Sequence, residues 1–156
     1  MAAIISEKLK EYINAKDTLK VVASIDKNGV PHIVFKGSLH VNEDGNIEFY
    51  EILESSRNNQ NFVHSIWFDK KVAVNILTSD RKSYEIVGKP LKSVTAGKVF
   101  EKVYVSLREQ RGDVDLAAIW TIEPEVVKEE TFVVRVQEDE EKYPLLKHLD
   151  RLYEGE

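Results

Sequence analysis

The residues whose types and spacing best suit a chemical role are Ser55, Ser56 and Arg57, which stand between an apolar strand pattern and a helical one. Two hydroxyls and a guanidinium at a helix N-terminus, where backbone N–H groups lack helical acceptors, can donate several hydrogen bonds to a phosphate. The same pattern also fits a plain helix cap, because a serine before a helix often accepts from first-turn N–H groups. The sequence therefore indicates either an anion site or a cap at this junction.

Other chemistries find little support in the residue types. The chain has no cysteine, which excludes disulfides, thiolate metal sites and cysteine nucleophiles. It has no G-x-S-x-G elbow, Walker-type phosphate loop or G-x-G-x-x-G motif, so serine hydrolase, NTPase and Rossmann functions are not indicated. We expect no metal site, because the histidines lack the His-x-x-x-His or His-x-His spacing of metal ligands: His32, His40, His64 and His148.

The bulk properties are those of one soluble globular domain, which we expect to span residues 1–156. A net charge of −5 at pH 7 argues against nucleic acid or an anionic membrane as a partner. The opening MAAIISEKLKEYI lacks the basic lead and long apolar core of a signal peptide, and no apolar run reaches membrane-spanning length. We therefore expect a cytoplasmic protein.

Two turn signals, Asn28-Gly29 and Asp44-Gly45, predict antiparallel hairpins, because both dipeptides suit the positive φ angles of tight turns. The apolar patterns predict strands over residues 19–26, 31–41, 47–53, 72–77, 83–87 and 117–122. The fifth strand continues over 91–96 after a bend or bulge at Gly88-Lys89-Pro90, and Glu123-Pro124 stops the sixth. Further extended segments are expected over 125–128 and 131–136.

Helices are expected over residues 3–15 and 57–68, from Gly97 to near Gly112, and over 138–153, where the apolar face consists of Leu145, Leu146, Leu149 and Leu152. Six or more short strands with peripheral helices, and no regular β-α alternation, predict a mainly β, α+β protein built on an antiparallel barrel.

In combination, four stretches of the chain resemble the FMN-binding split barrel of the pyridoxamine 5′-phosphate oxidase-like superfamily. They are VVASIDKNGVPHIVFKGSLHV, GNIEFYEILESSRNNQNF, KKVAVNIL and SYEIVGKP, and AIWTIEPEVVKEE would be a closing strand. The resemblance covers roughly residues 19–100 and depends on the order and spacing of the stretches. It implies a six-stranded antiparallel split β-barrel of Greek-key type, with FMN bound at the boundary of a homodimer.

The resemblance also implies a set of cofactor-binding residues. Phe35, Lys36, Gly37 and Ser38 would lie beside the isoalloxazine ring, and Tyr50 and Glu51 would border the cofactor. Ser55, Ser56 and Arg57 would hold the phosphate, with Asn61 one helical turn further on. Lys82 and Tyr84 would reach the flavin across the dimer interface. Lys36 could stabilise the reduced anionic ring from its N1–C2=O edge.

These features predict a small FMN-dependent oxidoreductase whose substrate is a small redox-active molecule or a nicotinamide such as NAD(P)H. The chain ends in YPLLKHLDRLYEGE, where true pyridoxamine phosphate oxidases carry an Arg-containing substrate strand, so that activity itself is not expected. Three alternatives stay open: a flavin-binding electron carrier without catalysis, a barrel that holds haem or the deazaflavin F420, and an interaction domain in which Ser55, Ser56 and Arg57 form only a helix cap.

Overall fold

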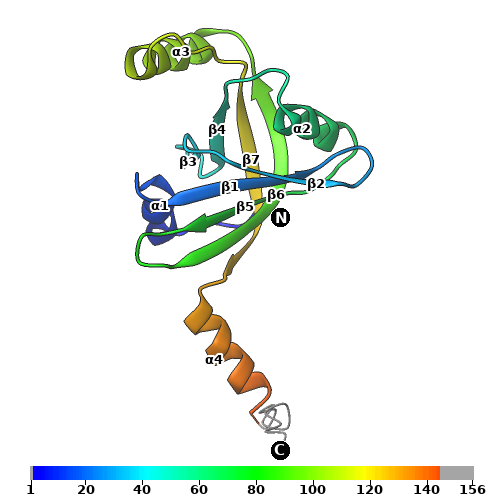
Figure 1. Cartoon of the computed structure of the whole chain (residues 1–156), viewed down its shortest axis with the longest axis vertical. Coiled ribbons are helices and arrows are strands. Elements are labelled where there is room, and N and C mark those ends of the chain that lie inside the picture. Colours follow the sequence, from blue (N-terminus) through cyan, green and yellow to red (C-terminus); the bar gives the residue numbers. More distant parts are fainter. Residues whose placement is uncertain (1, 145–156) are drawn as a thin grey trace, which may run out of the picture.

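The chain is known from a computed structural model, which describes residues 2–144. Within this range one antiparallel sheet of seven strands curls around a core (Figure 1). The strands are β1 Leu19–Ile25, β2 Pro31–Phe35, β3 His40–Val41, β4 Ile47–Glu51, β5 Val72–Leu77, β6 Ser83–Val94 and β7 Ala118–Glu129. The helices are α1 Glu7–Asn14, α2 Arg57–Trp67, α3 Lys98–Arg111 and α4 Phe132–Lys142. The strand order is β2-β1-β5-β6-β7-β4-β3.

The two predicted hairpin turns are present, and each is closed by a side chain. Asp26 Oδ1 accepts the N–H groups of Asn28 and Val30 at 2.8 and 2.9 Å in the β1–β2 turn, where Gly29 has a φ of 78°. Asn42 Oδ1 accepts two N–H groups in the same manner in the β3–β4 turn, where Gly45 has a φ of 80°. Asx turns of this kind let the local sequence fix both reversals.

A bulge at Gly88 lets the long β6–β7 pair bend, and this confirms the irregularity expected there. The register shifts between Val87 and Gly88 and again between Pro90 and Lys92. A Cβ added to Gly88 would lie 2.2 Å from the carbonyl oxygen of Glu123, so no other residue fits this close approach. The bend allows the sheet to curl into the predicted antiparallel split barrel, with seven strands rather than six.

Aromatic rings fill the core between the sheet and α2. The Phe62 ring on α2 meets Phe49 of β4 and Trp120 of β7 in edge-to-face contacts, with centroids 5.2 and 5.3 Å apart. Such contacts contribute about 0.5–1.5 kcal/mol each beyond the burial of apolar surface. Because α2 packs against β1, β2 and β6, these rings fix the start of the helix relative to the strands.

One expected strand, residues 31–41, is two strands in the structure. The chain turns after β2, where Leu39 N donates to Lys36 O at 3.1 Å, and β3 then pairs with β4 rather than with β1. The interruption lies at Gly37-Ser38, two residues common in turns, and it carries the chain from one edge of the sheet to the other.

The prediction that Glu123-Pro124 ends the sixth strand is wrong, because β7 continues to Glu129. Pro124 lies opposite Gly88 at the bulge, where the ladder is already irregular and a missing N–H costs little. The carbonyl of Pro124 accepts Ala3 N at 2.7 Å, which fastens the N-terminal segment to the sheet.

The extended segment expected over residues 131–136 is also wrong, since α4 begins at Phe132. The valines there suggested a strand, but Arg135 N donates to Thr131 O, and Arg135 pairs with Glu138 one helical turn further on. Residues 138–142 of the expected C-terminal helix belong to α4. The rest of that helix, including its four leucines, lies outside the described residues.

Candidate functional site

The N-terminus of α2 presents unsatisfied hydrogen-bond donors. Ser56 is the N-cap, and its Oγ accepts Asn59 N at 3.0 Å. Ser55 and Arg57 are exposed, and the first turn contains no acidic residue. Among the described residues no acceptor is found for the backbone N–H groups of Arg57 and Asn58. The sequence prediction of hydroxyl, guanidinium and amide donors at one helix end thus corresponds to a real cluster.

Arg57 is a cation without a counterion among residues 2–144, because no carboxylate of this range lies within 4.0 Å of its guanidinium. Its charge reaches the β1–β2 hairpin. The pKa of Asp26 lies below its usual range mainly because Asp26 accepts the Val30 N–H, with smaller contributions from Asn28 and from the positive charge of Arg57. Arg57 can therefore bind an external anion without breaking an ion pair.

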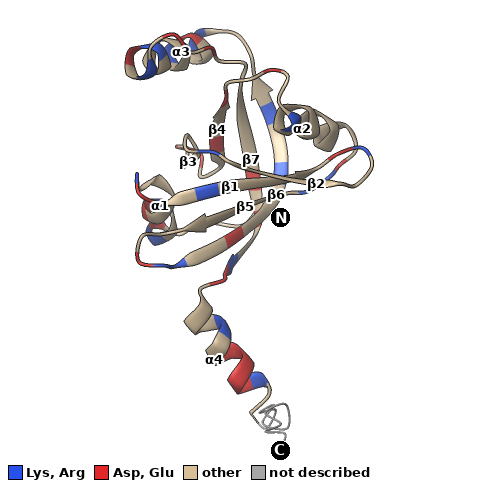
Figure 2. Ribbon diagram, viewed as in Figure 1, with Lys and Arg blue, Asp and Glu red and all other residues tan. Residues whose placement is uncertain are grey.

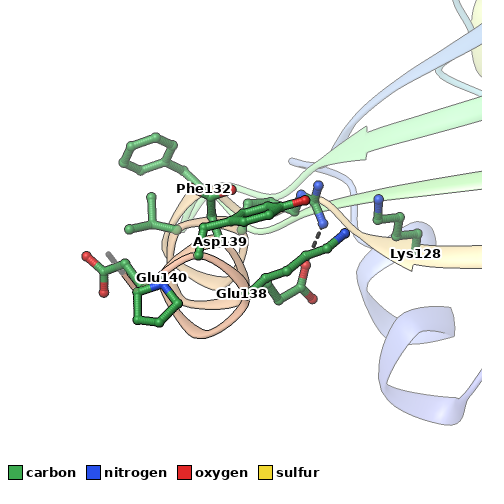
Figure 3. Close-up of a pocket in the computed structure, with 10 residues that line it drawn as sticks. Lys128, Phe132, Glu138, Asp139 and Glu140 are labelled. Atoms are coloured by element: carbon green, nitrogen blue, oxygen red, sulfur yellow. Dashed lines mark hydrogen bonds and ion pairs between the residues drawn. The ribbon is translucent and has the colours of Figure 1, made fainter. Parts of the chain in front are cut away.

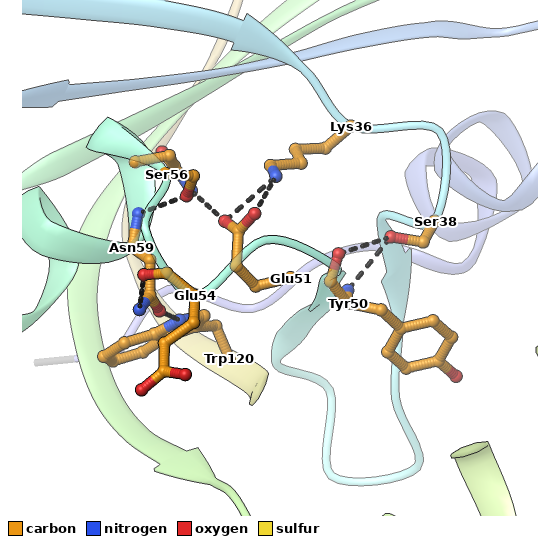
Figure 4. Close-up of polar contacts among 9 residues, drawn as sticks. Lys36, Ser38, Tyr50, Glu51, Glu54, Ser56, Asn59 and Trp120 are labelled. Atoms are coloured by element: carbon orange, nitrogen blue, oxygen red, sulfur yellow. Dashed lines mark hydrogen bonds and ion pairs between the residues drawn. The ribbon is translucent and has the colours of Figure 1, made fainter. Parts of the chain in front are cut away.

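A buried carboxylate lies beneath this helix end (Figure 4). Glu51, at the end of β4, is only 2% exposed. Lys36 Nζ donates to its two carboxylate oxygens at 2.9 and 3.0 Å, and Asn58 Nδ2 donates to Oε2 at 3.2 Å. These three residues come from the β2–β3 turn, β4 and the first turn of α2, so the pair holds together all the segments of the candidate site.

Asn58 is 1% exposed and leaves one buried polar atom unsatisfied. Its Oδ1 has no hydrogen-bond partner within the described part of the chain. The amide cannot be reversed, because Oδ1 would then face the carboxylate of Glu51. A buried acceptor without a donor costs about 1–3 kcal/mol, so this atom is suited to a donor that the chain itself does not supply, such as a ligand hydroxyl or a water.

Ser38 and Tyr50 connect the β2–β3 turn to β4. Tyr50 N donates to Ser38 Oγ at 2.9 Å, and the same hydroxyl lies 3.4 Å from Tyr50 O. Burial, and then the negative charge of Glu48, raise the pKa of the Tyr50 phenol. The Tyr50 ring packs edge-on against His40 at 5.5 Å.

The sequence analysis missed two positioning residues, Asn58 and Asn59. Trp120 Nε1 donates to Asn59 Oδ1 at 2.9 Å, and Asn59 Nδ2 donates to Glu54 O at 2.9 Å, so Asn59 ties the loop before α2 to β7 (Figure 4). The signal was present in the run Asn58-Asn59-Gln60-Asn61. Consecutive amides in a first helical turn are poor helix formers and are well suited to hydrogen bonds with neighbouring segments.

The other predicted cofactor residues lie in different surroundings. Phe35 is 68% exposed on the outer face of the sheet, and Gly37 is exposed in the β2–β3 turn. Asn61 is buried and donates to Ser24 Oγ at 3.1 Å, so its amide faces the core rather than the end of α2.

Lys82 and Tyr84 lie beside α1, at the β5–β6 hairpin. Lys82 Nζ donates to the Tyr12 hydroxyl at 2.9 Å, and Tyr84 donates to Glu129 Oε1 at 2.9 Å. Burial, followed by the bond to Glu129, raises the pKa of Tyr84 to about 12. None of the polar contacts of these two residues within residues 2–144 reaches the end of α2, so one chain alone does not unite the predicted set.

The geometry fits a phosphate monoester at one end and is nearly neutral at the other. Arg57, two serine hydroxyls and free N–H groups form the donor set, and the orphan acceptor of Asn58 lies next to it. Lys36, which was expected to act on the flavin ring, is compensated by Glu51. The net positive charge of the site therefore comes from Arg57.

Among residues 2–144, none of the helices combines the length and apolar character needed to cross a bilayer. The same range contains no cluster of three or more acidic or histidine side chains arranged to hold a metal ion.

Solved structures share this fold. HupZ from Group A Streptococcus has a TM-score of 0.66 at 22% identity, over 83% of this chain and 96% of that chain. An FMN-binding protein from Syntrophomonas wolfei has a TM-score of 0.62 at 14% identity, over 81% and 86%. HutZ, the haem storage protein from Vibrio cholerae, has a TM-score of 0.56 at 15% identity, over 81% and 95%.

No protein-family model matches the sequence, and no curated protein sequence matches it. The likeness to solved structures therefore shows the fold alone: the chain has the split-barrel fold of pyridoxamine 5′-phosphate oxidase-like proteins.

Proposed function

We propose that this protein binds FMN, with the phosphate at the N-terminus of α2, and that the bound flavin makes it an oxidoreductase. The observation that carries the proposal is Arg57, an exposed cation without a counterion in the described chain, beside two serines and free N–H groups. A flavin phosphate is dianionic near neutral pH, so each of these donors would make a charge-assisted hydrogen bond.

The protein's part in this function is binding and orientation. When bound, a flavin supplies the electron or hydride transfer. The pair Lys36–Glu51 fixes the β2–β3 turn against α2, and Asn58 Oδ1 offers an acceptor to a hydroxyl of the ligand. The electron partner that we propose is a nicotinamide, or a small quinone-like, nitro or vitamin B6 compound.

We also propose a homodimer that forms through the outer face of the sheet. Cross-strand pairing aligns a five-strand row that holds no charged side chain, and a second, shorter row begins at Phe35. The five-strand row consists of Ile33, Ala23, Ala73, Val87 and Val126. Ile33 and Phe35 are 66% and 68% exposed in the single chain. Apolar surface of this extent is typical of a protein–protein contact.

Haem is the second candidate ligand, and the observation that favours it is the likeness to HutZ, a haem storage protein of the same fold. Haem needs an axial ligand, and His32, His40 and His64 are the histidines of the described chain. F420 and a flavin carrier without turnover complete the set of alternatives.

The first test is the visible absorption spectrum of the purified protein, before and after incubation with excess FMN and removal of free ligand. One flavin per chain is the expected result, followed by assays of NAD(P)H oxidation to separate an enzyme from a carrier. A protein that retains no FMN would overturn the proposal, and a Soret band after incubation with haem would replace it.

The phosphate assignment is tested with Arg57→Glu, which we expect to weaken FMN binding by about 10- to 100-fold. Arg111→Glu is the matched control, because Arg111 is an exposed arginine on α3 and its reversal changes the net charge equally. Unchanged affinity in Arg57→Glu, or an equal loss in both variants, would contradict the assignment.

A further inference from the structure

Helix α4 lies away from the barrel at one end of the molecule (Figure 1) and has no buried residue. Phe132 and Val133 are 79% and 62% exposed, and with Val136 they form an apolar strip on one side of the helix, which we call the α4 strip. Figure 3 shows the Phe132 ring pointing away from the sheet. A helix with these side chains in water needs a partner, and its own chain supplies none among the described residues.

Helix α3 lies at the opposite end of the molecule and also has an incomplete surface (Figure 1). Its inner side packs around Leu107, whereas its outer side carries a shallow apolar groove lined by Phe100, Glu101, Tyr104 and Val105. Val105 is 52% exposed. The Phe100 and Tyr104 rings stack at 6.4 Å, which makes one wall of this α3 groove rigid.

The two helices carry opposite charges. Helix α3 has four basic and two acidic residues, a net charge of +2, and α4 has two basic and four acidic residues, a net charge of −2. The acidic run of α4 is visible in Figure 2. On a helical projection Asp139 and Glu140 flank the α4 strip, and Lys98 and Lys102 lie near Val105.

We propose that α4 of one copy packs along the α3 groove of a second copy, so that each dimer contains this contact twice. The helices of one chain lie too far apart to meet, but a two-fold dimer brings unlike ends together when the copies run in opposite directions. The alternative two-fold arrangement places α4 against α4, where two acidic helices would repel each other. The inference rests on the proposed dimer and is independent of the flavin.

Site-specific crosslinking tests the contact, and the absence of cysteine makes the chain well suited to it. A chain with both Val105→Cys and Val136→Cys should form a covalent dimer with a short flexible bismaleimide, which tolerates an error of about one helical turn, roughly 5.4 Å. Each single variant should stay uncrosslinked under the same conditions. Sedimentation analysis of the untreated variants establishes whether a dimer is present.

The outcomes separate this inference from the proposed function. A dimer in which only the double variant crosslinks supports the α3–α4 contact. A dimer without this crosslink, or one in which Val136→Cys alone crosslinks, overturns the contact and leaves the sheet-face dimer and FMN binding standing. A monomer overturns both the contact and the proposed dimer, while the FMN spectrum still decides the ligand.

Charge reversal gives an independent measure. Asp139→Lys with Glu140→Lys should weaken the dimer several-fold, and mixing this variant with Lys98→Glu/Lys102→Glu chains should restore one of the two contacts in a mixed dimer. Weakening without recovery in the mixture would contradict the pairing of these two helices.

Discussion

The carboxylate of Glu51 is the residue on which the candidate site depends most strongly. It is almost fully buried, and Lys36 and Asn58 supply its hydrogen bonds. A buried ion pair adds little net stability by itself, because desolvation offsets most of the attraction. Removing one partner is costly, since the other charge is then left in an apolar environment.

We therefore expect Lys36→Met to lower the free energy of unfolding by about 3–5 kcal/mol, and the double variant Lys36→Met/Glu51→Leu to recover most of this loss. Urea denaturation measures both. Lys89→Met, which breaks a pair with the exposed Asp69, is the control and should cost less than about 1 kcal/mol. Equal losses for Lys36→Met and Lys89→Met would mean that the Glu51 pair is effectively solvated.

Ser55 and Ser56 have different structural roles, which allows a cap to be separated from an anion site. Ser56→Ala should destabilise the protein by about 0.5–2 kcal/mol, because Asn59 N loses its acceptor. Ser55→Ala should leave stability unchanged, since among residues 2–144 the Ser55 hydroxyl has no hydrogen-bond partner, and should still weaken FMN binding. Thermal unfolding and FMN titration of both variants provide the comparison. If Ser55→Ala binds FMN normally, the first serine takes no part in the phosphate site.

At the scale of elements, the curl of the sheet depends on the close approach of β6 and β7 at Gly88. We expect Gly88→Ala to lower the unfolding free energy by about 1–3 kcal/mol or more, because the new methyl group would overlap the backbone of Glu123. Gly37→Ala is the control, since a Cβ there meets nothing within 4 Å and φ is not positive. Equal thermal stability of the two variants would show that the bulge can open without cost.

At the scale of the whole molecule, the outer face of the sheet should govern assembly. Phe35→Glu places a charge in the middle of the proposed interface and should convert the dimer to a folded monomer, as measured by sedimentation equilibrium and circular dichroism. Ile4→Glu is the control, because Ile4 is 91% exposed outside the sheet and its change should leave assembly intact. A Phe35→Glu variant that remains dimeric would move the interface elsewhere.

The sequence by itself determined the features that depend on neighbouring residues. The Asn-Gly and Asp-Gly turns, the serine cap of α2 and the irregular backbone at Gly88 are local chemistry, and each lies where the pattern predicted. The order of these local features was also enough to indicate the barrel, because short strands joined by tight turns have few ways to pair.

Tertiary structure decided the features that depend on residues distant in the sequence. Pro124 lies inside a strand only because Gly88, on the facing strand, makes a bulge opposite it. Glu51 lies next to Lys36 because the β2–β3 turn brings the end of β2 over β4, and this pairing turns an expected cofactor cation into a compensated one. Such contacts join positions whose local patterns carry no information about each other, so their chemistry follows from the packing of the sheet and α2.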